Sequence, residues 1–157
     1  MMTQFPTITG KTVNGARRTV PQDLYGKYNV VLIAFEQHHQ YDIDTWIPAL
    51  KPIKQQYPDL DVFELPIIEQ TRTSMVGRMM VDFWMYTGIP DSDVRDHTIT
   101  CYIDLQPFLD TLNMSNARQI YALLIDQTGI VYWQTSGVYT PTKLDSLIAI
   151  LQDLIIA

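Results

Sequence analysis

The chain lacks the residues that several common kinds of protein chemistry require. Its 157 residues include one cysteine, Cys101, which excludes an internal disulfide, a CxxC pair and a cysteine-rich zinc site. Lys and Arg number 11 against 17 Asp and Glu, and we find no run of cations of the kind that nucleic-acid binders use to displace counterions. No stretch approaches the roughly 18 consecutive apolar residues of a membrane span. We therefore expect no nucleic-acid partner and no membrane-spanning segment.

The sequence does contain enough apolar material for one folded domain. Hydrophobic residues make up 46% of the chain and charged residues 18%, a balance typical of a globular protein. There is no internal repeat, low-complexity tract or long linker, so residues 1–157 are predicted to form a single domain. Residues 1–10 have neither a basic nor an apolar leader pattern. This favours a soluble, cytoplasmic protein for the chain as given.

Strand-like and helix-like patterns alternate along the chain. An N-terminal hairpin is expected within about residues 1–25, because Asn14-Gly15 suits the positive φ angles of a tight turn. Apolar runs and helical spacing then predict strands at 30–35, 60–66, 98–104, 119–126 and 130–136, and helices at about 42–57, 73–88, 107–113 and from 141 onward. This order predicts an α/β sandwich with a mixed central sheet and helices on both faces.

Two short motifs resemble parts of one known fold. Gly26-Lys27 followed by the apolar run 30–35 resembles the entry of TlpA-like and peroxiredoxin-like proteins of the thioredoxin fold. Residues 124–126 with Gly129 resemble a later hairpin of the same fold. The resemblance covers nearly the whole chain and implies a thioredoxin-like three-layer sandwich.

The same resemblance identifies where such proteins keep their functional residues. In TlpA-like members a CxxC follows the first central strand, and a helix proline comes five residues after the second Cys. Aligned through Phe35 and Pro48, the two cysteine positions fall on Gln40 and Ile43. The position of the fold's cis-proline falls on Ile120.

Three further pieces of sequence resemble one branch of this fold more closely. They are Trp46 two residues before a helix proline, the segment 116–126 with an Asn before an apolar strand, and Trp133 leading into Ser136-Gly137. They are similar to the mitochondrial ATP-synthase assembly-factor family, which also lacks the cysteine pair. In that family the second hairpin strand tends to read IRW, whereas residues 130–133 here read IVYW. The resemblance implies an assembly chaperone that binds a protein or peptide partner.

The residues at the two cysteine positions cannot exchange thiols. Exchange needs a thiolate, whereas Gln40 offers an amide and Ile43 an aliphatic group. The remaining sulfur, Cys101, is predicted to share a strand face with Ile99 and Ile103, where a cysteine behaves as a small inert hydrophobe. We therefore expect a redox-inactive protein with no catalytic constellation and no cofactor. The alternative is a one-cysteine thiol peroxidase or oxidoreductase that uses Cys101.

A polar loop after the first central strand is the main candidate binding site. Loops at this end of a parallel strand commonly carry the functional residues of α/β folds. The candidate residues are His38, His39, Gln40, Asp42 and Asp44, with Ile120 from the turn that the fold places beside them. We expect a protein or peptide partner to bind there.

A metal site is a second alternative for the same loop. His38 and His39, with Asp42, Asp44 or His97, could ligate a transition metal. Adjacent side chains on an extended backbone point apart, however, so two neighbouring rings seldom reach one ion. We therefore favour simple loop polarity over metal binding.

The predicted helix over 73–88 is rich in methionine. Positions 75, 79, 83 and 86 would form an apolar stripe toward the core, which leaves Met80, Trp84 and Met85 as a candidate contact patch. Methionine is flexible and polarizable, so such a patch adapts to varied partners. A homodimer held through this helix is a further alternative.

Overall fold

The computed structural model describes residues 2–70 and 92–156. Seven strands lie within these residues: β1 Ile8–Thr12, β2 Arg17–Val20, β3 Tyr28–Ala34, β4 Leu60–Glu69, β5 Ile99–Ile103, β6 Tyr121–Asp126 and β7 Val131–Ser136. The helices are the 3-10 turn η1 Gln37–His39, α1 Gln40–Gln56, α3 Ser92–Asp96, α4 Leu105–Thr111 and α5 Pro141–Ile156. None of the described helices is long and apolar enough to cross a membrane.

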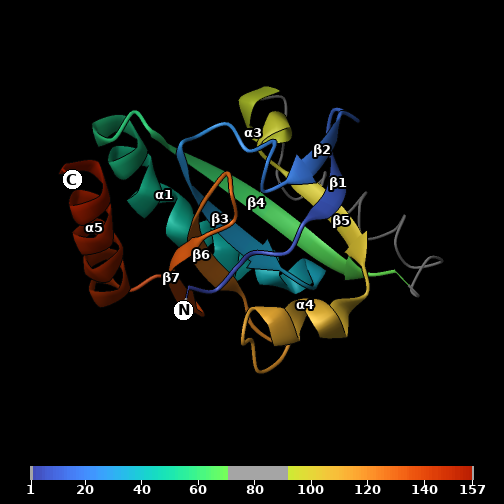
Figure 1. The fold of residues 1–157 in the computed structure, drawn as a ribbon. Helices are drawn as coiled ribbons and strands as arrows, with labels where there is room; N and C mark the ends of the chain where they lie inside the picture. The colour runs from blue at the N-terminus through green and yellow to red at the C-terminus, as the bar shows by residue number, and fades with distance from the viewer. Residues whose placement is uncertain (1, 71–91, 157) are drawn as a thin grey trace.

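The strands form one mixed sheet in the order β2-β1-β5-β4-β3-β6-β7 (Figure 1). β4 pairs in parallel with β3 and β5, and the other neighbours are antiparallel. The chain has a thioredoxin-like α/β fold with an N-terminal hairpin, as the sequence predicts. The predicted helix over 73–88, with Met80, Trp84 and Met85, lies outside the described residues.

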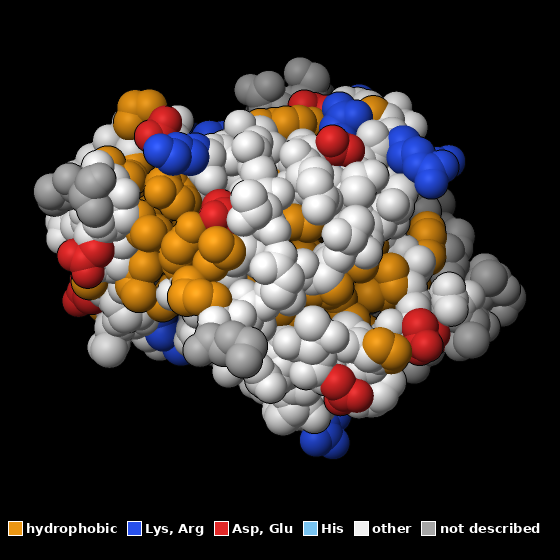
Figure 2. Space-filling model, viewed as in Figure 1, with side chains coloured by type: hydrophobic (Ala, Val, Ile, Leu, Met, Phe, Trp, Pro, Cys, Tyr) orange, Lys and Arg blue, Asp and Glu red, His pale blue; other side chains and the backbone are white. Residues whose placement is uncertain are grey.

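The continuous apolar run of β3 reflects burial on both faces of the sheet. Val31 and Ile33 belong to the core on the α4 side, whereas Val30 and Leu32 belong to the core under α1 and α5. Every residue of β3 is buried. Figure 2 shows apolar side chains gathered on the surface over α5 and the neighbouring edge of the sheet, where several residues of α5 and β7 are only partly buried.

β4 extends three residues beyond the predicted strand because it changes partners. It pairs with β3 until Pro66 meets Ala34 at the end of that strand. From Ile67 it pairs with β5 instead, and this second ladder continues to Glu69. A strand that bridges two neighbours is longer than either pairing alone requires.

The hairpin of β1 and β2 forms where the Asn14-Gly15 pair predicts it. Gly15 has a φ of 88°, a conformation that glycine adopts without strain. β1 then passes close to β5 at Gly10, where a Cβ would lie 2.4 Å from the Thr100 carbonyl oxygen. Glycine at this position therefore allows the hairpin to join the main sheet.

Candidate functional site

Three connecting segments meet at the end of the sheet where β3 stops. β6 begins and β7 ends beside the last residues of β3, because both pairings there are antiparallel. The Gly137 amide donates to the Ile120 carbonyl at 2.9 Å, and Trp46 Nε1 donates to the Gly137 carbonyl at 3.0 Å. These bonds connect α1, the turn before β6 and the turn after β7 into one unit.

Gln40 is buried at this end of the sheet rather than exposed on its surface. Its side chain is buried, and Nε2 donates to Asp44 Oδ1 at 2.9 Å and to Glu64 Oε1 at 2.8 Å. Burial raises the pKa of Glu64; the amide of Gln40 opposes this rise and Asp44 adds to it. The side-chain amide of Gln40 therefore donates a hydrogen bond to each of two carboxylates. Ile43, at the other cysteine position, is 1% exposed and packs in the core under α1.

His39 is held as a neutral ring. Its Nδ1 accepts bonds from the Phe35 and Glu36 amides at 3.0 and 3.3 Å. A ring nitrogen that accepts N–H bonds carries no proton, so the neutral ring holds its proton on Nε2. Burial lowers the pKa of His39, and His38 lowers it further, while Glu36 and the Arg118 carbonyl partly offset the effect. His39 thus closes the β3–α1 turn instead of presenting a lone pair.

The two histidines lie closer together than the sequence predicts. We expected an extended backbone that separates the rings, which is wrong: η1 is a 3-10 turn, and the ring centroids are 4.7 Å apart. Ligand atoms of His38, His39 and Glu36 lie within 4.8 Å of one another, and His38 Nε2 lies 3.4 Å from Glu36 Oε2. The third group is Glu36 rather than the predicted Asp42 or Asp44.

This cluster does not fit a metal ion as the side chains stand. Nδ1 of His39 is occupied by two backbone donors and Nε2 carries the proton, so the ring has no lone pair to give. Glu36 and His38 alone offer fewer ligands than a protein zinc site uses. The remaining predicted ligand, His97, lies at the opposite end of the sheet, with Nε2 2.9 Å from Asp61 Oδ2.

The predicted binding loop separates into a buried part and an exposed part. His39, Gln40 and Ile120 are buried, with at most 3% of each residue exposed. His38 and Asp44 are exposed, and Asp42 is half-buried in the first turn of α1. The buried residues can position a partner-binding surface, whereas direct contact falls to the exposed ones.

Cys101 is buried in the α4-side core, as its strand pattern predicts. It is 0% exposed, and burial raises the pKa of its thiol to about 12. At neutral pH the thiol therefore stays protonated, and the nucleophilic thiolate is scarcely populated.

Sequence reasoning did not find Glu64 or Glu36. A signal for Glu64 was present, because a carboxylate between Phe63 and Leu65 inside an apolar strand needs a buried partner. The identity of that partner, Gln40, depends on how α1 crosses β4 and could not be read from the chain. Glu36 gave no comparable signal.

Comparison with known families decides where the chain belongs. The family described as "ATP10 protein" matches residues 2–154, nearly the entire chain. The chain is a member of the ATP10 family. ATP10 proteins are ATP-synthase assembly factors, in agreement with the resemblance found in the sequence. No protein with a curated description matches this ATP10 member.

Solved structures similar to this ATP10 member share its fold. BsSco, a member of the Sco family of cytochrome c oxidase assembly proteins, is 12% identical with a TM-score of 0.61, over 97% of this chain and 94% of that one. An exposed lipoprotein thioredoxin from Streptococcus pneumoniae is 13% identical with a TM-score of 0.55, over 92% and 98%. A thiol-disulfide oxidoreductase from Bacteroides fragilis is 9% identical with a TM-score of 0.54, over 94% and 98%. At these identities the likeness shows the fold alone.

Proposed function

We propose that this chain is a redox-inactive assembly factor that binds a protein or peptide partner at the loop end of its sheet. Membership of the ATP10 family supports an assembly-factor role in general. The observation that carries the proposal is which residues occupy the two cysteine positions and what they contact. Gln40 is bonded to two carboxylates, and Ile43 is packed in the core. The fold's redox centre has become part of the protein's interior.

Exposed side chains around these positions form the proposed contact surface. We call it the loop face and define it by His38, Tyr41, Asp44 and Val138. Tyr41 is 63% exposed and Val138 41% exposed, although both are large apolar residues. The Tyr139 amide donates to Thr45 Oγ1 at 3.0 Å, which holds the Val138 turn against α1. A surface fixed in this way loses little conformational entropy when a partner binds.

Family membership also supports a proposal for the cellular compartment in which the partner is bound. ATP10 proteins are mitochondrial. The cytoplasmic location expected from the first residues therefore stays a prediction, and family membership favours a mitochondrial setting instead.

The contact surface can be tested by capture on the immobilised chain. We expect the triple variant His38→Ala/Tyr41→Ala/Val138→Ala to lose partners that the unaltered chain retains from a mitochondrial extract. His39 and Gln40 are unsuitable for this purpose, because their substitution disturbs the interior. Lys51→Ala, an exposed change on the same helix α1, is the matched control and should retain them. Equal capture by the triple variant would place the contact elsewhere on the molecule.

Redox inactivity has its own test. Mild peroxide and glutathione should leave Cys101 of the folded protein unmodified by mass spectrometry, because the thiol is buried and protonated. The same treatment in denaturant should modify it, which shows that the reagents work. Dithiol or peroxide turnover that disappears in Cys101→Ser would favour the one-cysteine enzyme instead.

A further inference from the structure

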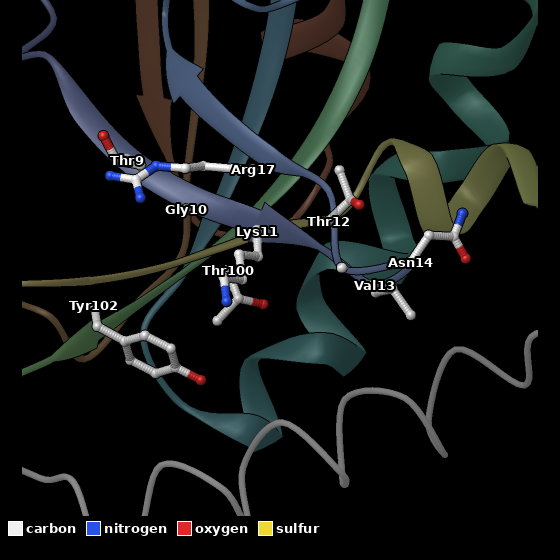
Figure 3. Close-up of a pocket in the computed structure, with 10 residues that line it drawn as sticks. Thr9, Gly10, Lys11, Thr12, Val13, Asn14, Arg17, Thr100 and Tyr102 are labelled. Carbon is white, nitrogen blue, oxygen red and sulfur yellow. The ribbon is translucent and has the colours of Figure 1, made fainter.

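A hollow of about 640 Å³ lies over the outer strands β1, β2 and β5. Its volume falls within the roughly 300–1,000 Å³ typical of small-molecule sites. The side chains that line it include Lys11, Arg17, Thr100 and Tyr102 (Figure 3). The four residues of the loop face take no part in it, so the hollow is independent of the proposed function.

Two cations occupy paired positions of the hairpin that borders the hollow, with Arg17 directed toward Thr9 and Lys11 toward Thr100 (Figure 3). Lys11 is directly opposite Arg17 in the antiparallel register of β1 and β2, and both side chains are exposed. Like charges opposite one another in this way destabilise a hairpin. Among the described residues no carboxylate lines the hollow, and neither cation forms an ion pair with any of them. In a chain with a net charge of −6, this local excess of positive charge requires an explanation.

One residue that lines the hollow, Tyr102, carries a hydroxyl group without a partner among the described residues. Tyr102 Oη is buried, and within the described part of the chain nothing forms a hydrogen bond with it. Burial raises the pKa of Tyr102, so the group remains a donor near neutral pH. Thr100, which is buried, lies directly opposite Lys11 in the pairing of β1 with β5. Figure 3 shows Lys11, Thr100 and Tyr102 on the same side of this strand pair. A buried polar atom that stays unpaired is unfavourable and indicates a missing partner.

We propose that this hollow binds a small anion of the phosphate type, either free phosphate or the phosphoryl group of a small metabolite. Lys11 and Arg17 neutralise its charge, the Thr100 hydroxyl donates to its oxygens, and the Tyr102 side chain turns to bring its buried Oη to a further oxygen. Arginine and lysine are the side chains that recognise phosphate most often. A carboxylate has two oxygens and would leave some of these donors unused, whereas a phosphoryl group has three or more.

The first test measures binding of inorganic phosphate and glycerol phosphate by calorimetry at constant ionic strength. We expect saturable binding, weakened about tenfold or more in Lys11→Ala/Arg17→Ala, because both charge contacts are lost. Lys51→Ala is the control and should bind as the unaltered chain does. Acetate at the same ionic strength should bind much more weakly. Tighter binding of glycerol phosphate identifies a phosphorylated metabolite, and tighter binding of phosphate identifies the free ion. Absence of saturable binding, or equal binding by the double variant, would overturn the proposal.

The second test separates a ligand contact from a structural role for Tyr102. Tyr102→Phe removes the unpaired hydroxyl, so thermal unfolding without ligand should shift upward or stay unchanged. Phosphate affinity should nevertheless fall several-fold. A purely structural hydroxyl would leave the affinity unaltered, and that result would remove Tyr102 from the site.

Discussion

The loop end of the sheet and its outer strands arrange their charged groups in opposite ways. At the loop end, the amide of Gln40 lies between two carboxylates and satisfies both. At the outer strands, Lys11 and Arg17 occupy paired positions of the hairpin, and no described carboxylate lines the hollow beside them. The first arrangement is complete within the chain. The second is unfavourable by itself and becomes favourable when an anion enters. Charged groups that have no partner within the chain can therefore indicate a binding site.

The largest effect on stability is expected from a substitution that removes the hydrogen bond between Gln40 and Glu64. Gln40→Leu leaves Glu64 partly buried without its donor, so the free energy of unfolding should fall by about 1–3 kcal/mol in urea titrations. Gln40→Leu/Glu64→Leu removes both partners and should recover much of the loss. If the double variant is less stable than Gln40→Leu alone, the bond between Gln40 and Glu64 is not what stabilises this region.

A smaller effect depends on pH and arises from His39. Its pKa in the folded protein is below the unfolded value of about 6.5, so the folded state binds fewer protons at acid pH. The resulting stability is present above about pH 6.5 and is lost as the pH falls toward the lower folded pKa. His39→Gln should reduce the difference in unfolding free energy between about pH 7.5 and 5.5. His38→Gln, which alters the exposed neighbour, should largely retain it.

The smallest effect on stability is expected from removing one of the two cations on the outer strands. Lys11→Thr removes one of the two cations at paired hairpin positions, so the ligand-free chain should gain about 0.2–1 kcal/mol at low salt. Lys11→Arg keeps the charge and should show no gain. Added salt should shrink the difference, because it screens exposed charges. A loss of stability in Lys11→Thr, compared with Lys11→Arg, would show that the two cations do not repel each other significantly.

Much of the fold could be predicted because its signals are local. The apolar run of β3 indicated burial on both faces, and Asn14-Gly15 indicated the hairpin. The helix predicted from 141 onward forms as α5, where Thr140 Oγ1 accepts the Lys143 amide at 3.3 Å as an N-cap. Each of these features depends on residues within a few positions of one another, so the chain alone specifies them.

The candidate site was less predictable because burial there is not local. His39 and Gln40 were predicted as part of a polar binding loop and Ile120 as a binding residue beside it, yet all three lie in the interior. Ile120 bonds to Gly137 beyond β7, and Gln40 bonds to Glu64 of β4, so both are held by segments far apart from them in the chain. Likewise, the backbone at His38 was expected to be extended, but Glu36 and His39 fold it into a 3-10 turn.

The sequence alone determined the alternation of elements, the absence of a cysteine pair and the positions of the cations on either side of a tight turn. Tertiary structure decided which of these groups meet. Gln40 and Glu64 are 24 residues apart and meet because α1 packs across β4, whereas Lys11 meets Thr100 because β1 pairs with β5. Local propensity fixes where strands and helices form. Only the order of strands in the sheet, set by burial of both faces, fixes which side chains become neighbours.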